Sequence, residues 1–284
     1  MQIKPREIAK LLIPPLLARS YHHLTRKKGN NSHSVEKLYL DGDYPSWDKA
    51  MAASTGYDSE IILEKTKVAL LKVKNGEAVY ERDSVLFDQI QYAWPVLAGL
   101  MWSAASNGGN LNVLDFGGSL GSTYFQNRRF FAGLESVRWN IVEQVRQVET
   151  GKRWFQDDHL KFYPSIQACL ADTKPQVILL SSVLQYLEKP YEIFAELLKT
   201  PCKHLIIDRT PFWSGPSDRL CVQHVPPSIY PASYPSWIFS QTKFYAWLSK
   251  DWQVMVTFDN PDRLAGPIEF SYQGLILVRK NHLS

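Results

Sequence analysis

Short apolar runs alternate with amphipathic stretches from residue 111 onward, and this alternation constrains the fold more than any other feature of the chain. The apolar runs are expected to form strands at residues 111–116, 138–142, 160–163, 176–181, 204–208, 253–258 and 272–280. Helical patterns separate the later runs, at residues 191–199 and 241–250. Strands that alternate with helices indicate βαβ units and a parallel sheet. The pattern therefore predicts an α/β fold with a seven-stranded, mostly parallel sheet and one antiparallel strand, the last.

The residues before this region have a helical character. Residues 59–74 carry apolar side chains at helical spacing and predict one helix, and a second helix is expected from about residue 84 to residue 105. Residues 37–108 are therefore predicted as a helical cap that leads into the main domain, residues 109–284.

One stretch interrupts the alternation after the expected strand at 204–208. Residues 209–240 contain six prolines and six aromatic residues, which predicts a long connection without regular strands or helices. Loops of this length in a compact domain are commonly functional, and the aromatic content argues against disorder. We therefore predict an aromatic-rich insertion loop that covers part of a site.

The first 28 residues form a basic arm, which continues as a polar segment to residue 36. Seven lysines and arginines face a single acid, and a short apolar run at 11–18 is broken by two prolines. Two interpretations remain open: contact with an anionic membrane surface, or packing of the arm on the domain. The run is shorter than the roughly 18 apolar residues of a membrane span. We expect a cytoplasmic protein, peripheral at the inner membrane surface under the first interpretation.

Charge and cysteine content exclude other classes of partner. The net charge of +4 on 284 residues is too small for the dense basic stripe of a nucleic-acid-binding protein. The three cysteines are isolated and lack the spacing of a metal site, so we expect reduced thiols. The Asp157-Asp158-His159 run is interpreted as a solvated turn, and no metal site is predicted.

The segment at 113–121 carries the residues of a nucleotide-binding turn. Gly117, Gly118 and Gly121 follow the first expected strand, and glycines let a backbone approach a ligand closely. A helix is expected from about Ser122, and the N–H groups at its start would face anionic parts of a ligand. Glu143 ends the next strand, where an acid can bind ribose hydroxyls. Together these features predict a nucleoside-binding site at the sheet edge.

The order of the glycines distinguishes between cofactors. A dinucleotide fingerprint reads G-x-G-x-x-G, and this turn does not match it. The turn resembles the D-x-G-x-G-x-G motif of class I S-adenosylmethionine (SAM)-dependent methyltransferases. Asp115, Gly117 and Gly121 match that motif, Ser119 stands in place of the middle glycine, and Gly118 is added. An acid before the turn suits SAM, whose methionine end carries an ammonium group.

Two further segments extend the resemblance over about residues 111–280. Residues 177–187 resemble the fourth-strand motif of these enzymes, with Gln185 where a histidine is common. The segments at 208–212 and 230–235 resemble a methyltransferase-like group found with polysaccharide biosynthesis genes. The resemblance implies a Rossmann-like class I methyltransferase fold and SAM as cofactor. It also implies O-methylation of a sugar, a glycan precursor or another polar small molecule.

The resemblance and the strand ends together define candidate site residues. The expected cofactor-binding residues are Asp115, Phe116, Gly117, Gly118, Ser119, Gly121, Glu143, Gln144, Asp158, Ser181 and Ser182. Within this set, the resemblance implies that Asp158 contacts the adenine.

Three residues are candidates for the chemistry of the acceptor. His224 is the candidate general base because it lies in the aromatic insertion. Asp208 could orient the base or accept a proton, and Arg209 could bind an anionic acceptor. Each also has a structural interpretation: His224 could pack or lie on the surface, and Asp208 could pair with Arg209.

Two other functions remain alternatives. The first is an NAD-dependent Rossmann oxidoreductase or nucleotide-sugar enzyme, against which the glycine order argues. The second is a non-catalytic scaffold protein that retains the methyltransferase fold, which the substitutions at Ser119 and Gln185 leave open.

Overall fold

The computed structural model describes residues 38–56, 59–82, 84–226, 232–262 and 264–280. These belong to one compact unit, residues 37–284. The basic arm predicted at 1–36, and with it the predicted membrane contact of residues 1–28, lies outside the described residues.

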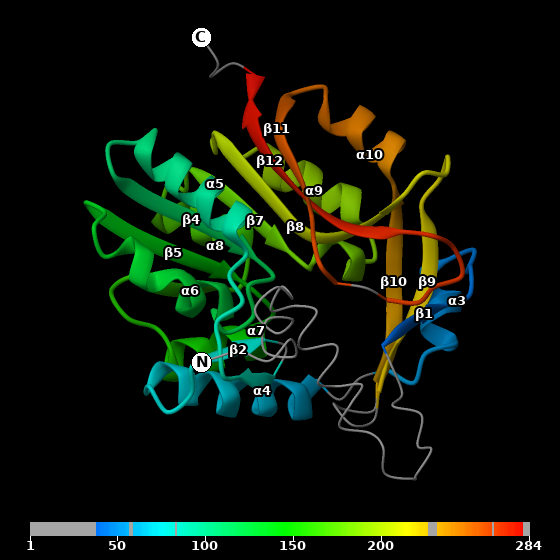
Figure 1. The fold of residues 1–284 in the computed structure, drawn as a ribbon, viewed down its shortest axis with the longest axis horizontal. Coiled ribbons are helices and arrows are strands. Elements are labelled where there is room, and N and C mark those ends of the chain that lie inside the picture. The colour runs from blue at the N-terminus through cyan, green and yellow to red at the C-terminus, as the bar shows by residue number, and fades with distance from the viewer. Residues whose placement is uncertain (1–37, 57–58, 83, 227–231, 263, 281–284) are drawn as a thin grey trace, which may run out of the picture. The chain divides into compact units, whose positions relative to one another are not determined.

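Seven strands of the main sheet reproduce the predicted α/β architecture (Figure 1). The five parallel strands lie in the order β6 (Leu160–Tyr163), β5 (Ser136–Val142), β4 (Asn110–Phe116), β7 (Val177–Ser181) and β8 (His204–Trp213). Strand β12 (Ser271–Arg279) then pairs antiparallel with β8, and β11 (Trp252–Asp259) pairs antiparallel with β12. Among these seven strands, only the last runs antiparallel to the others, as predicted.

Consecutive residues of the central strands face two separate cores. Val113 and Leu179 belong to one core, whereas Leu114 and Ile178 belong to the other. This alternation follows from the two-residue period of a strand, and both faces are apolar because helices cover both.

Helices on the first face are α4 (Ser59–Lys74), α5 (Trp94–Ala105), α6 (Ser122–Asn127) and α7 (Val145–Trp154). Helices on the second face are α8 (Ile166–Asp172), α9 (Pro190–Leu198) and α10 (Gln241–Leu248). Short 3-10 helices follow α6 and β7: η1 (Arg128–Phe131) and η2 (Leu184–Tyr186). The result is a sheet wound on both sides, with its carboxyl edge left for a site.

The segment expected as a loop at 209–240 is mostly strand, and this part of the prediction is wrong. Residues 209–213 extend β8, and β9 (Arg219–Val225) and β10 (Ala232–Ser240) form an antiparallel pair. Strand β10 joins β8 only at Phe239 and Ser240, and β1 (Tyr39–Asp41) pairs with the far side of β9. The sheet thereby gains three strands beyond the predicted seven, and β9 and β10 are visible as long arrows beside α3 (Trp47–Ala52) in Figure 1.

The prolines explain why the strands were missed. Proline interrupts a strand ladder only where its absent N–H is needed. Pro235 pairs with Val222 of β9, while β8 reaches β10 only at its last two residues. Because β8 does not pair with Pro235, the missing N–H of the proline breaks no hydrogen bond between β10 and β8, and the strand continues through it.

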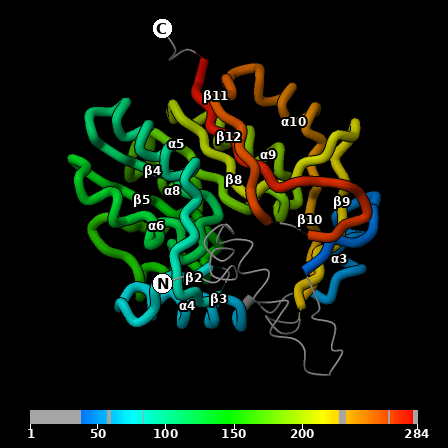
Figure 2. Tube along the Cα trace, viewed as in Figure 1, coloured from blue at the N-terminus to red at the C-terminus, as the bar shows by residue number. Residues whose placement is uncertain are grey.

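The predicted helical cap is partly correct. Helix α4 has the predicted bounds, but the helix expected from residue 84 begins only at Trp94. A hairpin of β2 (Tyr80–Arg82) and β3 (Val85–Phe87) occupies the earlier residues. Pro95 lies in the first turn of α5, where proline is favoured because no helical N–H bond is needed there. The tube in Figure 2 shows this hairpin close to α4.

Helix α5 lies directly on the sheet at a glycine. A Cβ atom on Gly99 would lie 2.8 Å from Cδ1 of Ile206 in β8, so a larger residue here would require the Ile206 side chain to move. The cap is thus packed on the same unit as the sheet, where it supplies walls for the site.

Candidate functional site

A cavity of about 590 Å³ lies at the carboxyl ends of β4, β7 and β8. It is within the size range of small-molecule sites, about 300–1,000 Å³. Strand β4 is the point where the chain order reverses, with β5 on one side and β7 on the other, and ligands of open α/β sheets bind at such points. The walls come from the turn after β4, the ends of β7 and β8, the β2–β3 hairpin, and strands β9, β10 and β12.

The glycine turn brings its backbone close to neighbouring side chains. Gly117 and Gly121 have φ values of 74° and 102°, a region that favours glycine. A Cβ on Gly117 would lie 2.3 Å from Cγ2 of Val183, and one on Gly118 would lie 2.4 Å from Oδ2 of Asp115. Glycine is therefore favoured at 117 by both conformation and space, and at 118 by space alone.

Asp115 is a buried acid directly beneath this turn. Its side chain is 1% exposed, and the indole Nε1 of Trp139 donates to its Oδ2 at 2.8 Å. Burial raises the pKa of Asp115 from 3.8 to about 7, the nearby charge of Glu143 adds to the rise, and the Trp139 hydrogen bond opposes it. A cationic ligand in the cavity would therefore favour the ionised form of Asp115.

Glu143 is held against the outside of the same turn. Its carboxylate accepts hydrogen bonds from the backbone N–H of Ser119 at 3.2 Å and of Gln144 at 2.8 Å. Burial raises its pKa, while both hydrogen bonds lower it. Glu143 stabilises the turn, and it is not among the residues that line the cavity.

The structure divides the residues predicted to bind the cofactor into two groups. Those that line the cavity are Asp115, Gly117, Gly118, Ser119, Ser181 and Ser182. Those that do not line it are Phe116, Gly121, Glu143, Gln144 and Asp158, of which Gln144 and Asp158 are exposed.

Asp208 is buried beside the cavity instead of lining it. The hydroxyl of Ser181 donates to its Oδ2 at 2.9 Å, and the Asn260 amide donates to its Oδ1 at 3.4 Å. Burial raises the pKa of Asp208, and the neighbouring Arg209 lowers it. With Arg209 Nε 3.8 Å from Asp208 Oδ2, the two residues form the ion pair that the sequence left as an alternative.

Arg209 lines the cavity because β8 is irregular at this point. Asp208 and Arg209 together lie opposite the single residue Gly274 of β12, which is a β-bulge. Arg209 has a φ of 49°, and Gln185 Nε2 donates to its carbonyl at 3.2 Å. A bulge re-aims a side chain, and here the guanidinium group belongs to the cavity wall.

His224 lies on the other face of β9. Successive side chains of a strand point to opposite faces, and Gln223 and Val225 are the residues that line the cavity. The His224 ring stacks on Tyr39 of β1, with centroids 4.6 Å apart and planes 10° apart. His224 is therefore not placed to act as the base.

Sequence reasoning missed a polar network on the cavity face of the added strands. The Tyr186 hydroxyl donates to Gln223 Oε1 at 3.0 Å, and Gln223 Nε2 donates to the Tyr234 hydroxyl at 3.2 Å. The Tyr186 and Tyr234 rings meet edge to face at 5.4 Å. Gln223 and Tyr234 are register partners in β9 and β10, and because burial does not alternate along either strand, no local pattern marks them.

The hairpin adds further charged residues to the wall. Glu81 and Arg82 of β2 both line the cavity, and Arg82 Nη2 lies 3.5 Å from Asp262 Oδ1. The sequence offered no motif for these residues, because they come from the region expected to be helical.

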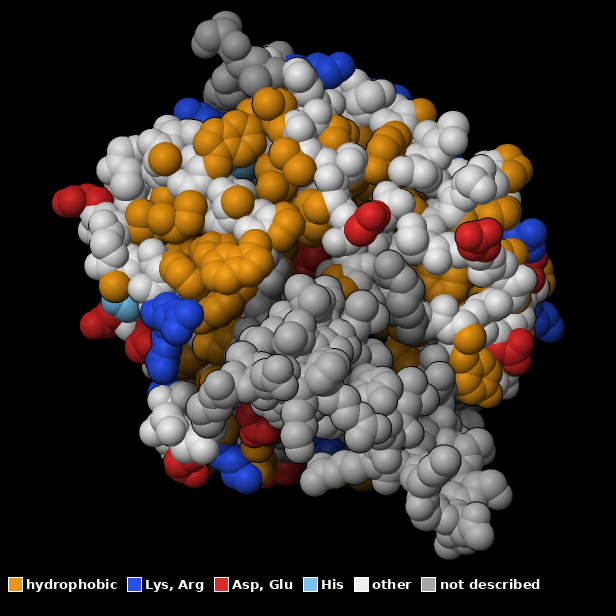
Figure 3. Space-filling view, in the orientation of Figure 1, with side chains coloured by type: hydrophobic (Ala, Val, Ile, Leu, Met, Phe, Trp, Pro, Cys, Tyr) orange, Lys and Arg blue, Asp and Glu red, His pale blue; other side chains and the backbone are white. Residues whose placement is uncertain are grey.

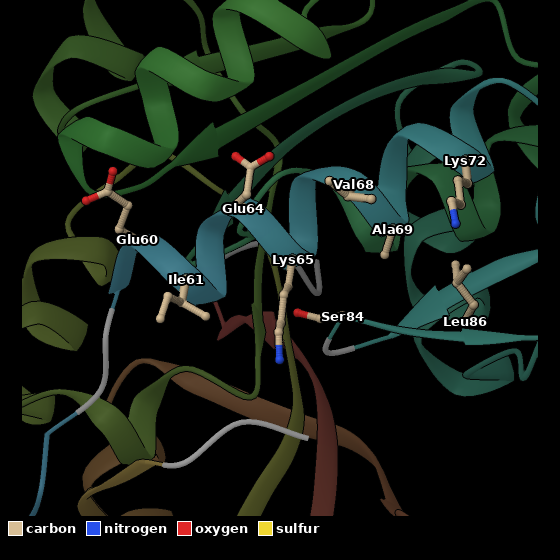
Figure 4. Close-up of a pocket in the computed structure, with 9 residues that line it drawn as sticks. All are labelled: Glu60, Ile61, Glu64, Lys65, Val68, Ala69, Lys72, Ser84 and Leu86. Carbon is tan, nitrogen blue, oxygen red and sulfur yellow. The ribbon is translucent and has the colours of Figure 1, made fainter. Parts of the chain in front are cut away.

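A second hollow of about 550 Å³ runs along the outer side of α4 (Figure 4). Two acids, Glu60 and Glu64, and two lysines, Lys65 and Lys72, line it from α4, with Ser84 and Leu86 of the hairpin opposite. It contains neither the glycine turn nor the ends of the parallel strands, so the cavity at the sheet edge is the candidate site.

Other classes of site find no support in the part of the chain that the structure describes. No group of three or more His, Cys, Asp or Glu there could hold a metal ion. Cys169, Cys202 and Cys221 are buried free thiols, and burial raises the pKa of each. None of the described helices has the length and apolar content to cross a bilayer. In Figure 3, the visible lysines and arginines lie apart from one another around the described surface.

Comparison with known proteins gave similarities to solved structures alone. A scan against protein-family models and a search of curated proteins found no match. The chain is similar to the N-terminal domain of EvdMO1 crystallised with S-adenosylhomocysteine (SAH) and D-fucose. The identity is 12%, 79% of this chain and 97% of that chain are covered, and the TM-score is 0.44. It is also similar to magnesium protoporphyrin IX methyltransferase from Synechocystis PCC 6803 with bound SAM: 14% identity, 76% and 97% covered, TM-score 0.43. A third similarity is to the glycopeptide N-methyltransferase MtfA with sinefungin: 11% identity, 63% and 92% covered, TM-score 0.44.

Proposed function

We propose that this protein is a SAM-dependent methyltransferase. The observation that carries the proposal is the glycine turn over buried Asp115, at the point where the strand order of the sheet reverses. The turn provides close backbone approach, and the acid provides a partner for the ammonium group of the methionine end.

The residues of the cavity fit SAM chemically. Small residues line the floor, namely Gly117, Gly118, Ser119, Ser181 and Ser182. They leave room for the nucleoside, and the serines supply hydroxyl groups for its polar atoms. The cofactor when bound supplies a methyl group already activated on a sulfonium, so the protein has mainly to align an acceptor with it.

The second half of the cavity supports a hydroxyl-bearing acceptor. The Tyr186, Gln223 and Tyr234 network offers phenol and amide groups together with aromatic edges, which suits a sugar or another polar small molecule. Arg209 adds a cation that would bind an acidic group of the acceptor. O-methylation of a sugar or glycan precursor is therefore the reaction we propose.

Binding of nucleotide ligands tests the cofactor. Calorimetry is expected to detect SAH with a dissociation constant of roughly micromolar order, and no heat with NAD. NAD binding without SAH binding would instead favour the oxidoreductase. If SAH binds but no acceptor in a panel of sugars and nucleotide sugars is methylated, the scaffold alternative is favoured.

Asp262 is the candidate base for the acceptor. Among the described residues that line the cavity, it is the one carboxylate besides Asp115 and Glu81. We expect Asp262→Asn to lower the rate of methyl transfer at least about 100-fold, the low end for loss of a general base. SAH affinity should stay within about twofold, because the change lies away from the turn. The measurement is transfer of labelled methyl to the best acceptor of the panel.

Asp259→Asn is the matched control, because Asp259 is exposed and close to Asp262 in the chain. This variant should transfer methyl groups at the wild-type rate. Full activity of Asp262→Asn would remove Asp262 as the base.

A further inference from the structure

We infer that Glu81 of the β2–β3 hairpin is a second carboxylate that recognises the ammonium group of the cofactor's methionine end. This inference rests on the proposed function, and it concerns a residue that lies outside the sheet and outside every motif found in the sequence. Glu81 lines the same cavity as Asp115 and Gly118.

Glu81 is buried, and it accepts a hydrogen bond from the residue that follows the glycine turn. Its residue is 1% exposed, and its Oε2 accepts a hydrogen bond from the Ser122 hydroxyl at 2.6 Å. Its Oε1 accepts from the backbone N–H of Ser84 at 2.7 Å. Ser122 directly follows Gly121 and also lines the cavity. A carboxylate from 41 residues upstream is thus attached to the segment that would hold the cofactor.

The hairpin that carries Glu81 is fixed in place on two sides. On one side, the hydroxyls of Thr66 in α4 and Ser84 are hydrogen-bonded at 2.8 Å, and Figure 4 shows Ser84 opposite α4. On the other side, Gln126 Nε2 of α6 donates to the Tyr80 hydroxyl at 3.3 Å. Ser84 has a φ of 68°, a strained value for a residue other than glycine, and the surrounding contacts hold it there. The carboxylate is therefore positioned before any ligand arrives.

Two acids in the cavity wall can accept hydrogen bonds from a cation. The Asp115 carboxyl lies against Gly118 and Glu81 accepts from Ser122, so both acids adjoin the glycine turn in the cavity wall. An ammonium group forms charge-assisted hydrogen bonds with a carboxylate, so acids at this place favour the charged methionine end of the cofactor. Neutral nucleosides would lack this gain.

Two ligands separate this role from a purely structural one. SAH carries the amino acid portion, and 5′-methylthioadenosine carries the same thionucleoside without it. Glu81→Gln removes the charge but keeps the shape, and its amide oxygen can still accept from Ser84 N–H while its amide nitrogen can donate to Ser122. We expect this variant to lose at least about tenfold in SAH affinity, as for a hydrogen bond to a charged group. Methylthioadenosine affinity should change less than about twofold.

The exposed Glu77→Gln is the matched control, because it removes the same charge close by in the chain, from a residue that does not line the cavity. It should bind both ligands as the wild type does. Ser122→Ala provides a second variant that keeps the charge of Glu81 but releases its Oε2, and it should also weaken SAH more than methylthioadenosine.

Calorimetry on folded protein decides the inference. Wild-type SAH affinity in Glu81→Gln, or equal losses of both ligands, would overturn it, because equal losses indicate a role in hairpin position alone. If Glu81→Gln does not fold, equal losses of both ligands in Ser122→Ala overturn it in the same way. Failure of the wild type to bind SAH would instead overturn the proposed function.

Discussion

Exchange of Asp115 for asparagine is expected to stabilise the ligand-free protein above pH 7 and to remove most of its affinity for SAH. The wild-type carboxyl group is buried, with a pKa raised from 3.8 to about 7. Asparagine has the shape of the protonated acid and can still accept the Trp139 hydrogen bond. The variant therefore avoids a buried charge that the wild type acquires as the pH rises.

The direction of the pH effect follows from proton linkage. The folded wild type binds the Asp115 proton more tightly than the unfolded chain, so its free energy of unfolding falls as the pH rises from about 4 to about 7. The asparagine variant has no ionisable group at this position, so its free energy of unfolding should not show this fall. The difference should be small at pH 4 and reach at most about 4 kcal/mol above pH 7, from the size of the pKa rise. Urea unfolding at pH 5 and pH 8 measures it.

The effect of pH on SAH binding should be opposite to its effect on stability. An ammonium group favours the Asp115 carboxylate, so SAH affinity of the wild type should rise between pH 6 and pH 7.5 as the proton is lost. The asparagine variant should bind at least about tenfold more weakly, with a flatter profile in this range. The exposed Asp251→Asn should follow the wild type in stability and binding. A variant whose stability has the same pH dependence as the wild type would contradict the burial argument.

Gly117→Ala is expected to lower stability and SAH affinity more than any other glycine-to-alanine change in the site. The residue has a φ of 74°, and the new Cβ would lie 2.3 Å from Cγ2 of Val183 and 2.9 Å from its Cβ. Val183 is β-branched and cannot rotate both atoms away. Left-handed strain costs roughly 1–2 kcal/mol, and overpacking costs roughly 1–3 kcal/mol. We expect a loss of about 2–5 kcal/mol in the free energy of unfolding and at least about tenfold in SAH affinity.

Gly133→Ala is the control for this change. Its Cβ would meet no atom within 4 Å, and its backbone does not require glycine. Stability should change by less than about 0.5 kcal/mol, as at ordinary surface positions. Chemical denaturation of both variants checks the pair. Equal stabilities would mean that the turn after β4 can shift, and that Val183 does not restrict it.

Local pattern predicted the elements whose burial is regular. Strand β6 and helix α4 have the expected bounds, and the other strands of the seven-stranded sheet differ by few residues except at the end of β8. Periodicity succeeds here because each of these elements buries a whole face, which a single sequence window records. The prediction failed at residues 209–240, where prolines are typical of loops but Pro211 and Pro235 lie in strands, paired with Tyr272 and Val222.

The site shows the same division between local and tertiary information. The glycine turn and Asp115 can be recognised in the amino-acid sequence, because a tight strand-to-helix turn after an acid is a contiguous pattern. That Glu81 and Gln223 line the cavity and His224 does not is visible only in the folded chain. Their positions depend on the pairing of β9 with β10 and on the packing of the hairpin against α6, and such contacts between distant segments form only when the chain folds.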